Sequence, residues 1–247
     1  MERHDRPPVG TFFVDEPLAT TRSLELSERA NQHARVKRIE DGDTVRLIDG
    51  TGVFAIGRIA PLVRGSYHID VDRIESLPRP SAIHLRVAVG DRDRMLWLAE
   101  KATELGVESW QGVLYRRSRS VAPRGEGDAF AAKVRARMIS AMEQSGGVWL
   151  PRILPDATIE TIDEPANANR ILLDQDGGPF AASAARSAFV ITFGPEGGLE
   201  AMERSVLIDR GWHPSRLAES TLRFETAGIA AMSVLRAAQV PQEVDRG

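Results

Sequence analysis

Cysteine is absent from this sequence of 247 residues. Its absence excludes disulfides, thiolate nucleophiles and cysteine-ligated metal sites. The five histidines are scattered without the spacing of a metal site, so we expect no metal. Long apolar runs are also missing: none approaches the roughly 20 residues that cross a bilayer, and the N-terminal segment lacks the apolar region of a signal peptide. We therefore expect a cytoplasmic protein with no membrane partner.

An excess of positive charge is missing as well. The chain has 32 Lys and Arg against 35 Asp and Glu, a formal net charge of −3. Proteins that coat nucleic acids neutralise phosphate over a broad basic surface, so this charge argues against that class, and any RNA site must be local. Only three of the basic residues are lysine. Arginine suits bidentate phosphate contacts, but a GC-rich genome would produce the same bias.

The first part of the chain alternates apolar and polar residues as strands do. Four segments show the pattern: 11–14, 43–50, 53–63 and 67–77. The sequence Asp49-Gly50-Thr51-Gly52 supplies the glycines of a tight hairpin. These features predict a small antiparallel β-barrel. Pro78 and Pro80 interrupt any regular ladder and mark the expected linker.

Beyond this linker, strands alternate with helices. Apolar residues recur with helical spacing from Arg92 to Leu105. The remaining expected elements are strands at 82–89, 112–115, 170–174 and 188–193, and helices at 128–144, 199–209 and 225–238. This alternation predicts an α/β domain with a parallel sheet and a ligand at the carboxyl ends of its strands.

Two stretches near the C-terminus have the character of ligand-binding loops. They are "ITFGPEGGLEAMERS" at Ile191–Ser205 and "LAESTLRFETAGIAA" at Leu217–Ala231. In each, an apolar segment leads through a turn-rich loop into a helix, which presents bare backbone groups to a small ligand. Neither loop matches the phosphate-binding or the dinucleotide-binding glycine pattern. A nucleoside triphosphate or NAD is therefore a poor candidate ligand.

The two motifs resemble those of the knotted SPOUT methyltransferases, and more narrowly those of the small-subunit ribosomal RNA methyltransferase E family. Further similar segments occur in the family's order at 31–50, 101–107, 119–121 and 143–147. Two positions depart from the family pattern. Lys37 stands where the family usually has leucine, and Gly147 stands where members tend to carry arginine, which removes one candidate RNA or substrate contact.

The resemblance implies a fold and a reaction. The implied fold is α/β, with an N-terminal PUA-like β-barrel that binds RNA at residues 1–78 and a SPOUT domain with a trefoil knot at residues 79–247. The implied cofactor is S-adenosyl-L-methionine. The implied reaction is methylation of a uridine of 16S rRNA at N(3), on free rRNA or on the small ribosomal subunit, by a homodimer. A SPOUT enzyme with another RNA target and a non-catalytic RNA-binding assembly factor remain alternatives.

By the same resemblance, three loops hold the cofactor. Glycines let a backbone approach a ligand closely, and Leu217 and Leu222 suit an apolar slot for the adenine. For Glu196, capping of the following helix is an alternative role. The implied cofactor-binding residues are Leu173, Asp174, Gln175, Phe193, Gly194, Pro195, Glu196, Gly197, Gly198, Leu217, Ser220, Leu222, Arg223, Thr226 and Ala227.

Methylation of the uridine imide nitrogen requires that its proton be removed or shared. The imide nitrogen is protonated at neutral pH, so a base must take the proton or a nearby cation must favour the anion. Arg223 and Arg119 are our candidates for stabilising the uridinate or holding its phosphate, and Glu225 is a candidate for orienting one of them. Helix initiation is the alternative role for Glu225 and Thr226.

Basic residues cluster in two places that suit RNA. Four arginines lie between Tyr115 and Gly125 without an intervening acid, and three basic residues lie in the barrel segment. Charge on a solvated loop is the alternative interpretation of the arginine run. The candidate RNA-binding residues are Arg35, Lys37, Arg38, Arg116, Arg117, Arg119 and Arg124.

The last expected helix is apolar on nearly every side. Arg236 and Gln239 are its only polar residues beyond the first turn, apart from Ser233. Such a helix is buried on more than one side, either in a subunit interface or as the central helix of a monomer. With the family resemblance, this pattern predicts a homodimer.

Overall fold

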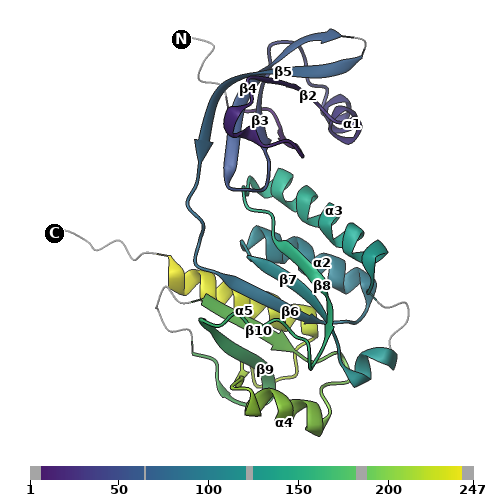
Figure 1. Cartoon of the computed structure of the whole chain (residues 1–247), viewed down its shortest axis with the longest axis vertical. Coiled ribbons are helices and arrows are strands. Elements are labelled where there is room, and N and C mark those ends of the chain that lie inside the picture. Colours follow the sequence, from purple (N-terminus) through teal and green to yellow (C-terminus); the bar gives the residue numbers. More distant parts are fainter. Residues whose placement is uncertain (1–6, 64, 121–124, 182–187, 241–247) are drawn as a thin grey trace, which may run out of the picture. The chain divides into compact units, whose positions relative to one another are not determined.

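A computed structural model describes residues 7–63, 65–120, 125–181 and 188–240 (Figure 1). The chain divides into two compact units. One comprises the residues up to Arg79 together with Ile139–Leu150, and the other comprises Pro80–Met138 and the residues from Pro151 onward. The expected functional domains, 1–78 and 79–247, would place 139–150 with the second part. That assignment stays a prediction.

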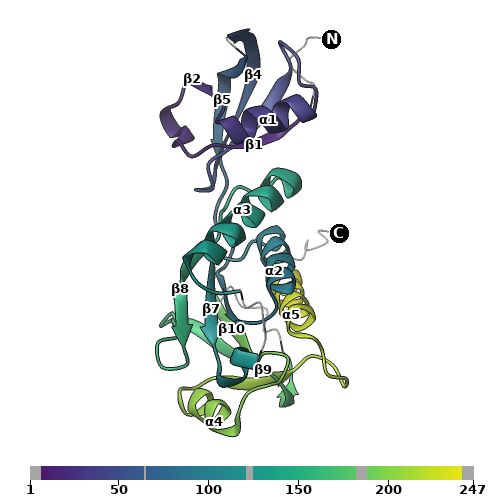
Figure 2. The same ribbon diagram turned by 90° about the vertical axis from the view of Figure 1, so that its right-hand side faces the viewer.

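The first unit contains a curled five-stranded sheet with the order β1-β3-β4-β5-β2 (Figure 2). All pairs are antiparallel except β1 and β3, which are parallel. The predicted antiparallel arrangement is therefore confirmed for most of the sheet, which forms a half-barrel. Its elements are β1 (Thr11–Phe13), η2 (Leu18–Thr20), β2 (Ser23–Glu25), α1 (Glu28–Val36), β3 (Thr44–Ile48), β4 (Val53–Val63) and β5 (Ser66–Ser76).

The predicted hairpin turn joins β3 to β4. Gly50 and Gly52 have φ values of +79° and +94°, which other residues rarely adopt. The Asp49 carboxylate accepts hydrogen bonds from the Thr51 backbone N–H at 2.8 Å and from the Thr51 hydroxyl at 2.7 Å. Fully buried Phe12, Val45 and other apolar side chains form the core of this unit.

Residues 139–150 bind the sheet of the first unit. Glu143 Oε1 accepts a hydrogen bond from the Phe13 backbone N–H at 3.0 Å, and Oε2 accepts one from Arg29 Nη2 at 2.7 Å. The Arg46 guanidinium donates to the Gly146 carbonyl at 2.7 Å. Arg29 and Arg46 thus hold the C-terminal end of the long helix α3 (Asp128–Ser145) within this unit.

The second unit contains a six-stranded sheet with the order β11-β9-β10-β6-β7-β8, in which every pair is parallel. The predicted parallel α/β arrangement is confirmed. The strands are β6 (Ile83–Ala88), β7 (Ser109–Leu114), β8 (Arg152–Thr158), β9 (Ala168–Pro179), β10 (Ala188–Phe193) and β11 (His213–Arg216).

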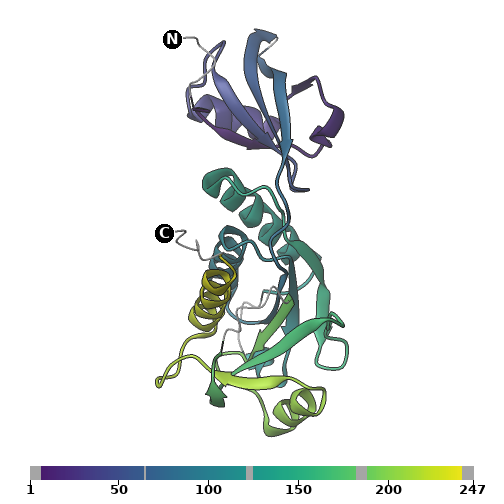
Figure 3. The same ribbon diagram turned by 90° about the vertical axis from the view of Figure 1, so that its left-hand side faces the viewer.

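Helices cover the sheet of the second unit on both sides (Figures 2 and 3). On one side α2 (Arg92–Glu104) packs against α5 (Phe224–Gln239), and α4 (Ala201–Asp209) lies on the other side. The Asp91 carboxylate begins α2 by accepting from the backbone N–H groups of Asp93 and Arg94, at 3.1 and 3.0 Å. Arg236 of α5 donates to the carbonyls of Leu105 and Ser81, each at 2.7 Å.

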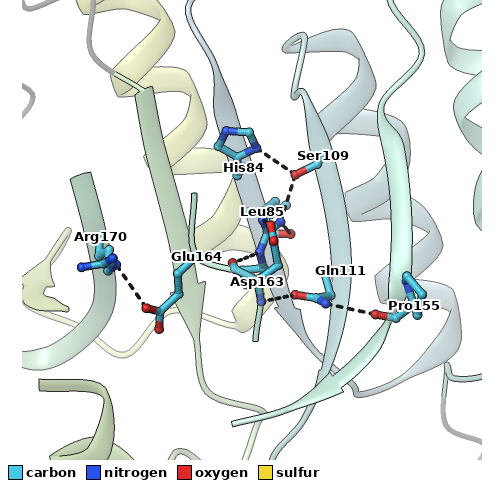
Figure 4. A network of polar contacts seen from close by, with 9 residues as sticks. His84, Leu85, Ser109, Gln111, Pro155, Asp163, Glu164 and Arg170 are labelled. Atoms are coloured by element: carbon cyan, nitrogen blue, oxygen red, sulfur yellow. Dashed lines mark hydrogen bonds and ion pairs between the residues drawn. The ribbon is translucent and has the colours of Figure 1, made fainter. Parts of the chain in front are cut away.

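A buried arginine anchors the connection between β8 and β9 (Figure 4). Arg86, in the middle of β6, is fully buried. Its Nε donates to the Asp163 carbonyl at 2.7 Å, its Nη2 donates to the Asp163 carboxylate at 2.5 Å, and its Nη1 donates to the Ser109 hydroxyl at 3.0 Å. Burial lowers the pKa of Arg86 to about 10, and Asp163 opposes this shift.

The same network holds two further groups in place (Figure 4). His84 Nδ1 lies 2.8 Å from the Ser109 hydroxyl. Gln111 accepts a hydrogen bond from the Asp163 backbone N–H at 2.9 Å and donates one to the Pro155 carbonyl at 3.1 Å. Polar side chains in the core of the sheet therefore fix a connection that has no regular structure of its own.

Candidate functional site

A cavity of about 450 Å³ lies where two loops meet strand β9 of the second unit; Leu173–Gln175, which we expected in a third loop, belong to this strand. Its wall comes from the second half of β9, from the loop after β10, and from the segment between β11 and the first turn of α5. The volume lies within the range of about 300–1,000 Å³ that is typical of sites for small molecules and cofactors. The expected position at the carboxyl ends of parallel strands therefore holds a real cavity.

The predicted cofactor-binding residues gather around this cavity. All of them line it except Gly197 and Thr226. Residues that are up to 54 positions apart in the chain, such as Leu173 and Ala227, are thus brought together. That they bind a cofactor stays a prediction.

The glycine loop after β10 needs its glycines for close backbone contacts. A Cβ atom at Gly194 would lie 3.0 Å from the Leu199 nitrogen and 3.1 Å from the Gly198 carbonyl carbon. Gly198 has a φ of +72° and donates its N–H to the Pro195 carbonyl at 2.7 Å. The loop is therefore a tight turn whose backbone forms part of the cavity wall.

Several cavity residues were not predicted from the sequence. Arg204 of α4 pairs with the Asp174 carboxylate, and no spacing in the sequence connects these two positions. Phe224 stacks on Phe193 with ring centroids 6.2 Å apart. Phe224 lies within the motif Leu217–Ala231, and this position was the one available signal. The lining residues outside the predicted cofactor segments 173–175, 194–198 and 217–223 that sequence reasoning missed are Asp176, Leu199, Arg204, Ser215, Arg216 and Phe224.

Hydrogen bonds join strand β9 to one of the two loops of the cavity wall. The Thr221 hydroxyl donates to Gln175 Oε1 at 2.5 Å, and Gln175 Nε2 donates to the Glu219 carbonyl at 3.4 Å. Gln175 therefore ties β9 to the segment before α5. This contact gives Gln175 a structural role at the cavity wall, whatever the cavity binds.

Arg94, near the start of α2, lies between two carboxylates. Its Nη1 is 3.4 Å from Glu196 Oε1, and its Nε is 3.9 Å from Glu225 Oε1. The Glu225 side chain is 7% exposed, and its Oε2 has no hydrogen-bond partner among the residues that the structure describes. We predicted that Glu225 orients Arg223 or Arg119. The arginine that the structure places beside it is Arg94.

Of the three predicted catalytic residues, the structure describes the side chains of Arg223 and Glu225 but not that of Arg119. Arg223 lines the cavity and is the N-cap residue of α5, with its carbonyl accepting the Ala227 N–H at 2.9 Å. Glu225 and Thr226 lie in the first turn of that helix, as the alternative of helix initiation requires. The side chain of Arg119 lies outside the described part of the chain. Their catalytic roles stay predictions.

The arginine run forms a short helix, η3 (Arg116–Ser120). Arg117 Nη1 donates to the Gly197 carbonyl, and the Arg116 backbone N–H donates to Glu203 Oε1 at 2.8 Å. The Arg116 side chain is largely exposed, with its Nε 3.7 Å from Glu200 Oε2. Arg124 lies outside the described residues.

The predicted basic patch of the first unit lies at the C-terminal end of α1. Arg35, Lys37 and Arg38 are all exposed, together with Val36. Arg35 donates to the Gly65 carbonyl at 2.6 Å, and Arg38 has a φ of +55°, uncommon for a residue with a side chain. Their binding of RNA stays a prediction.

The described residues contain neither a membrane-spanning helix nor a cluster of metal-binding side chains. No helix there has the length and apolar character that crossing a membrane requires. No three histidine, aspartate or glutamate side chains in that part of the chain are grouped so as to hold a metal ion.

Comparison with known proteins identifies related sequences and folds. The model of a family described as "RNA methyltransferase domain" matches residues 77–236. The chain is 26% identical over 220 residues to ribosomal RNA small subunit methyltransferase E of Aquifex aeolicus, covering 86% of this chain and 93% of that protein. It is 27% identical over 244 residues to the protein of the same name from Mycobacterium bovis, covering 92% and 91%.

A solved structure shows a similar fold. It is ribosomal RNA small subunit methyltransferase E from Neisseria gonorrhoeae, bound to S-adenosyl methionine. Its TM-score is 0.82 and its sequence identity 26%, with 92% of this chain and 97% of that chain covered. The similarity therefore extends over both units of the chain.

Proposed function

Because the chain belongs to the RNA methyltransferase domain family, we propose that it is an S-adenosyl-L-methionine-dependent enzyme that methylates a uridine of 16S rRNA at N(3). The observation that carries the proposal is the cavity of about 450 Å³, because both motif loops and the second half of β9 line it. The names of the related proteins support the choice of small-subunit rRNA as substrate.

The cavity wall has the chemistry that this cofactor requires. An adenine ring needs an apolar slot with backbone donors and acceptors at its edge, and Leu173, Leu217 and Leu222 lie near the bare backbone of Gly194 and Gly198. The wall carries acidic side chains at Asp174, Asp176 and Glu196 and arginines at Arg204, Arg216 and Arg223, which suits a cofactor that has sulfonium, ammonium and carboxylate groups. The cavity therefore fits the cofactor in both size and lining.

The predicted cofactor residues take two kinds of role in this proposal. The glycine loop and the segment from Leu217 to Leu222 hold the adenine and ribose, while Phe193 and Phe224 form the apolar floor. Gln175 and the pair of Asp174 with Arg204 keep the loops in place around the ligand. When bound, the cofactor supplies a methyl group that is activated by a positively charged sulfur.

The protein must also make the uridine nitrogen nucleophilic. We assign Arg223 and Arg119 to stabilise negative charge on the uracil oxygens as the imide proton leaves. We assign Glu225 to orient an arginine, and its distance of 3.9 Å from Arg94 Nε supports Arg94 in place of Arg223 or Arg119 as that partner. A preorganised cation of this kind costs no reorganisation during the reaction, which is why such groups contribute strongly to catalysis.

RNA binding is divided between two basic surfaces in this proposal. Residues 1–78 form a PUA-like RNA-binding domain that uses Arg35, Lys37 and Arg38. Residues 79–247 form the SPOUT domain, in which Arg116, Arg119 and Arg124 contact phosphates. The exposure of the first three residues and of Arg116 supports these roles. Arginine favours bidentate phosphate contact.

Three further features complete the proposal. The loops around the cavity belong to a trefoil knot, as the family resemblance implies. The enzyme is a homodimer, and the exposed Val234 on α5, with a 42% exposed side chain, supports an interface on that helix. The protein acts in the cytoplasm, where small ribosomal subunits are found.

The test is methyl transfer to defined RNA. The purified full chain is incubated with methyl-labelled S-adenosylmethionine and small ribosomal subunits from a strain that lacks the modification. The RNA is then digested and its labelled nucleosides are identified by mass spectrometry. The expected product is N(3)-methyluridine in 16S rRNA, lost when Arg223 is replaced by alanine.

Each of the other outcomes would reject a specific part of the proposal. Label in another nucleoside or another RNA would keep the cofactor and reject the target. Binding of the cofactor without transfer to subunits or to free 16S rRNA would reject the substrate. If neither transfer nor cofactor binding occurs, only the non-catalytic RNA-binding alternative remains.

A further inference from the structure

Gly197 differs from its neighbours in the glycine loop. Of the residues Gly194–Gly198, it alone does not line the cavity. Its carbonyl instead accepts a hydrogen bond from Arg117 Nη1 in η3. A Cβ atom at Gly197 would lie 3.3 Å from Arg117 Cδ and 3.5 Å from Arg117 Cβ. The stem of Arg117 thus packs on the glycine while its guanidinium binds the carbonyl of the same residue.

A second contact joins the same two segments. Glu203, in the first turn of α4, is 5% exposed. Its Oε1 accepts from the Arg116 backbone N–H at 2.8 Å, and its Oε2 accepts from the Glu200 backbone N–H at 2.9 Å. One carboxylate therefore connects the beginning of η3 to the helix that follows the glycine loop. Both of its oxygens are used, which satisfies a buried charge.

These contacts have a mechanical consequence. One face of the glycine loop forms the cavity wall through Gly194, Pro195, Glu196 and Gly198, while Gly197 connects the loop to η3. These contacts offer a route by which a shift of the wall would move η3. If ligand binding at one site shifts the other, linkage requires that each ligand change the other's affinity by the same factor.

We propose that Arg117 is a positioning residue. It couples occupancy of the cavity to RNA binding by η3 (Arg116–Ser120). The inference rests on the proposed function, because it takes the two ligands to be the methyl-donor cofactor and RNA. It gives Arg117 a different role from the direct phosphate contact predicted from the sequence. Arg117 holds η3 against the glycine loop, and its neighbours contact the RNA.

The experiment measures the coupling directly. Radiolabelled S-adenosylhomocysteine, which cannot transfer a methyl group, is bound to the full chain by equilibrium dialysis with and without saturating small ribosomal subunits. For the wild-type protein, subunits are expected to tighten this binding by at least about fivefold. In R117A the ratio of the two affinities is expected to fall to about one.

Two other variants distinguish loss of the contact between Arg117 and Gly197 from loss of the positive charge of Arg117. G197A keeps the charge of Arg117 but adds a methyl group 3.3 Å from its Cδ, which displaces the arginine slightly, so the ratio is expected to fall below that of wild type but less than in R117A. R117K keeps the positive charge but replaces the planar guanidinium with an ammonium group. The ratio is therefore expected to lie between those of R117A and wild type. If R117A does not fold, as judged by its melting curve, G197A carries the test.

Matched controls should keep the wild-type ratio. R73A removes the same charge from an exposed ion pair with Glu75 in the other unit. G178A adds a methyl group where no heavy atom lies within 4 Å. Neither residue touches the cavity or η3, so a reduced ratio in either control would mean that the measurement does not report this contact and would overturn the inference.

The failures of the inference and of the proposed function are distinguishable. If R117A weakens subunit binding equally with and without S-adenosylhomocysteine, and the ratio is unchanged, Arg117 is a direct RNA contact and the coupling is rejected. A wild-type ratio of one, with both ligands bound, also rejects the coupling but leaves the proposed function intact. If the wild-type protein binds neither ligand, the proposed function is wrong and the inference falls with it.

Discussion

Arg94 Nη1 lies 3.4 Å from Glu196 Oε1, although 102 positions separate the two residues in the chain. The same guanidinium extends toward buried Glu225, so one side chain of α2 connects the glycine loop with the first turn of α5. A Cβ atom at Gly90 would lie 3.2 Å from Glu196 Oε2, which shows how closely the segment before α2 approaches this carboxylate.

Replacement of Arg94 tests whether this cation serves catalysis. R94A is expected to lower the kcat of methyl transfer by about 100-fold, the usual cost of removing one preorganised charge from an active site. KM for the cofactor is also expected to rise, because Arg94 pairs with Glu196, which lines the cavity. Steady-state kinetics with labelled methyl donor and small subunits give both values.

The control for R94A is R92A, which removes the same charge from the same turn of α2. Arg92 lies over the Phe130 ring, 5.6 Å from its centroid, and does not line the cavity. R92A should keep kcat within about threefold of wild type, equivalent to about 0.7 kcal/mol. An R94A enzyme with a wild-type kcat would exclude Arg94 from the catalytic step.

Gly194 is predicted to be essential for binding the cofactor. In G194A the added Cβ meets the main chain of Gly198 and Leu199, which cannot rotate away as a side chain can. The loop must therefore shift, and the affinity for S-adenosylhomocysteine is expected to fall at least about tenfold, or about 1.4 kcal/mol. Titration calorimetry measures this affinity.

G178A, with open space around the added atom, should bind as the wild-type protein does. Equal affinities of all three proteins would show that this loop does not contact the ligand.

Local sequence signals predicted much of the second unit. The expected helices at 92–105, 128–144 and 225–238 correspond to α2, α3 and α5 within one or two residues, because each has clear apolar periodicity or a strong start and end. The glycine loop after β10 was found for a similar reason, whereas Gly177 and Gly178, which we expected in a second glycine loop, lie within β9. A tight turn between a buried strand and a helix leaves its mark in consecutive residues.

Elements that depend on partners far along the chain were missed. Strand β11 reads His-Pro-Ser-Arg and has no strand pattern of its own; it forms by pairing with β9. Helix α1 is short and polar, with only Ala30 and Ala34 as its buried apolar residues. The contacts of Arg94 and Arg204 were missed because no local rule connects an arginine with a carboxylate 30 or 102 positions away.

Asp163 is predicted to stabilise the second unit through buried Arg86. D163A removes the carboxylate that accepts from Arg86 Nη2 and leaves a buried guanidinium with less compensation. Asp163 is itself half-exposed, so we expect a loss of about 2 kcal/mol of unfolding free energy, below the cost of breaking a fully buried pair. Urea unfolding followed by the fluorescence of buried Trp110 and Trp212 measures the change.

A surface pair of similar chemistry provides the comparison for D163A. Asp72 accepts two hydrogen bonds from Arg58, but both side chains are about 40% exposed. D72A is expected to cost less than about 1 kcal/mol. If the two variants lose equal stability, the buried network around Arg86 contributes no more than an exposed ion pair.

His84 is predicted to make the protein less stable in acid. Burial lowers the pKa of His84 in the folded protein, and the nearby positive charge of Arg86 lowers it further. As the pH falls below about 6.5, the unfolded chain takes up a proton that the folded protein resists. The contribution of His84 to stability is therefore fully present above that pH and is lost as the pH falls through the lower pKa of the folded state.

The measurement is the unfolding free energy between pH 7.5 and 5, compared with that of H84N. Asparagine retains a side-chain amide that can hydrogen bond to the Ser109 hydroxyl, now 2.8 Å from His84 Nδ1, but it does not titrate. The slope of stability against pH should therefore be smaller in H84N than in wild type, even if H84N is less stable at pH 7.5. Equal slopes for H84N and wild type would mean that the proton uptake on acid unfolding occurs elsewhere in the chain.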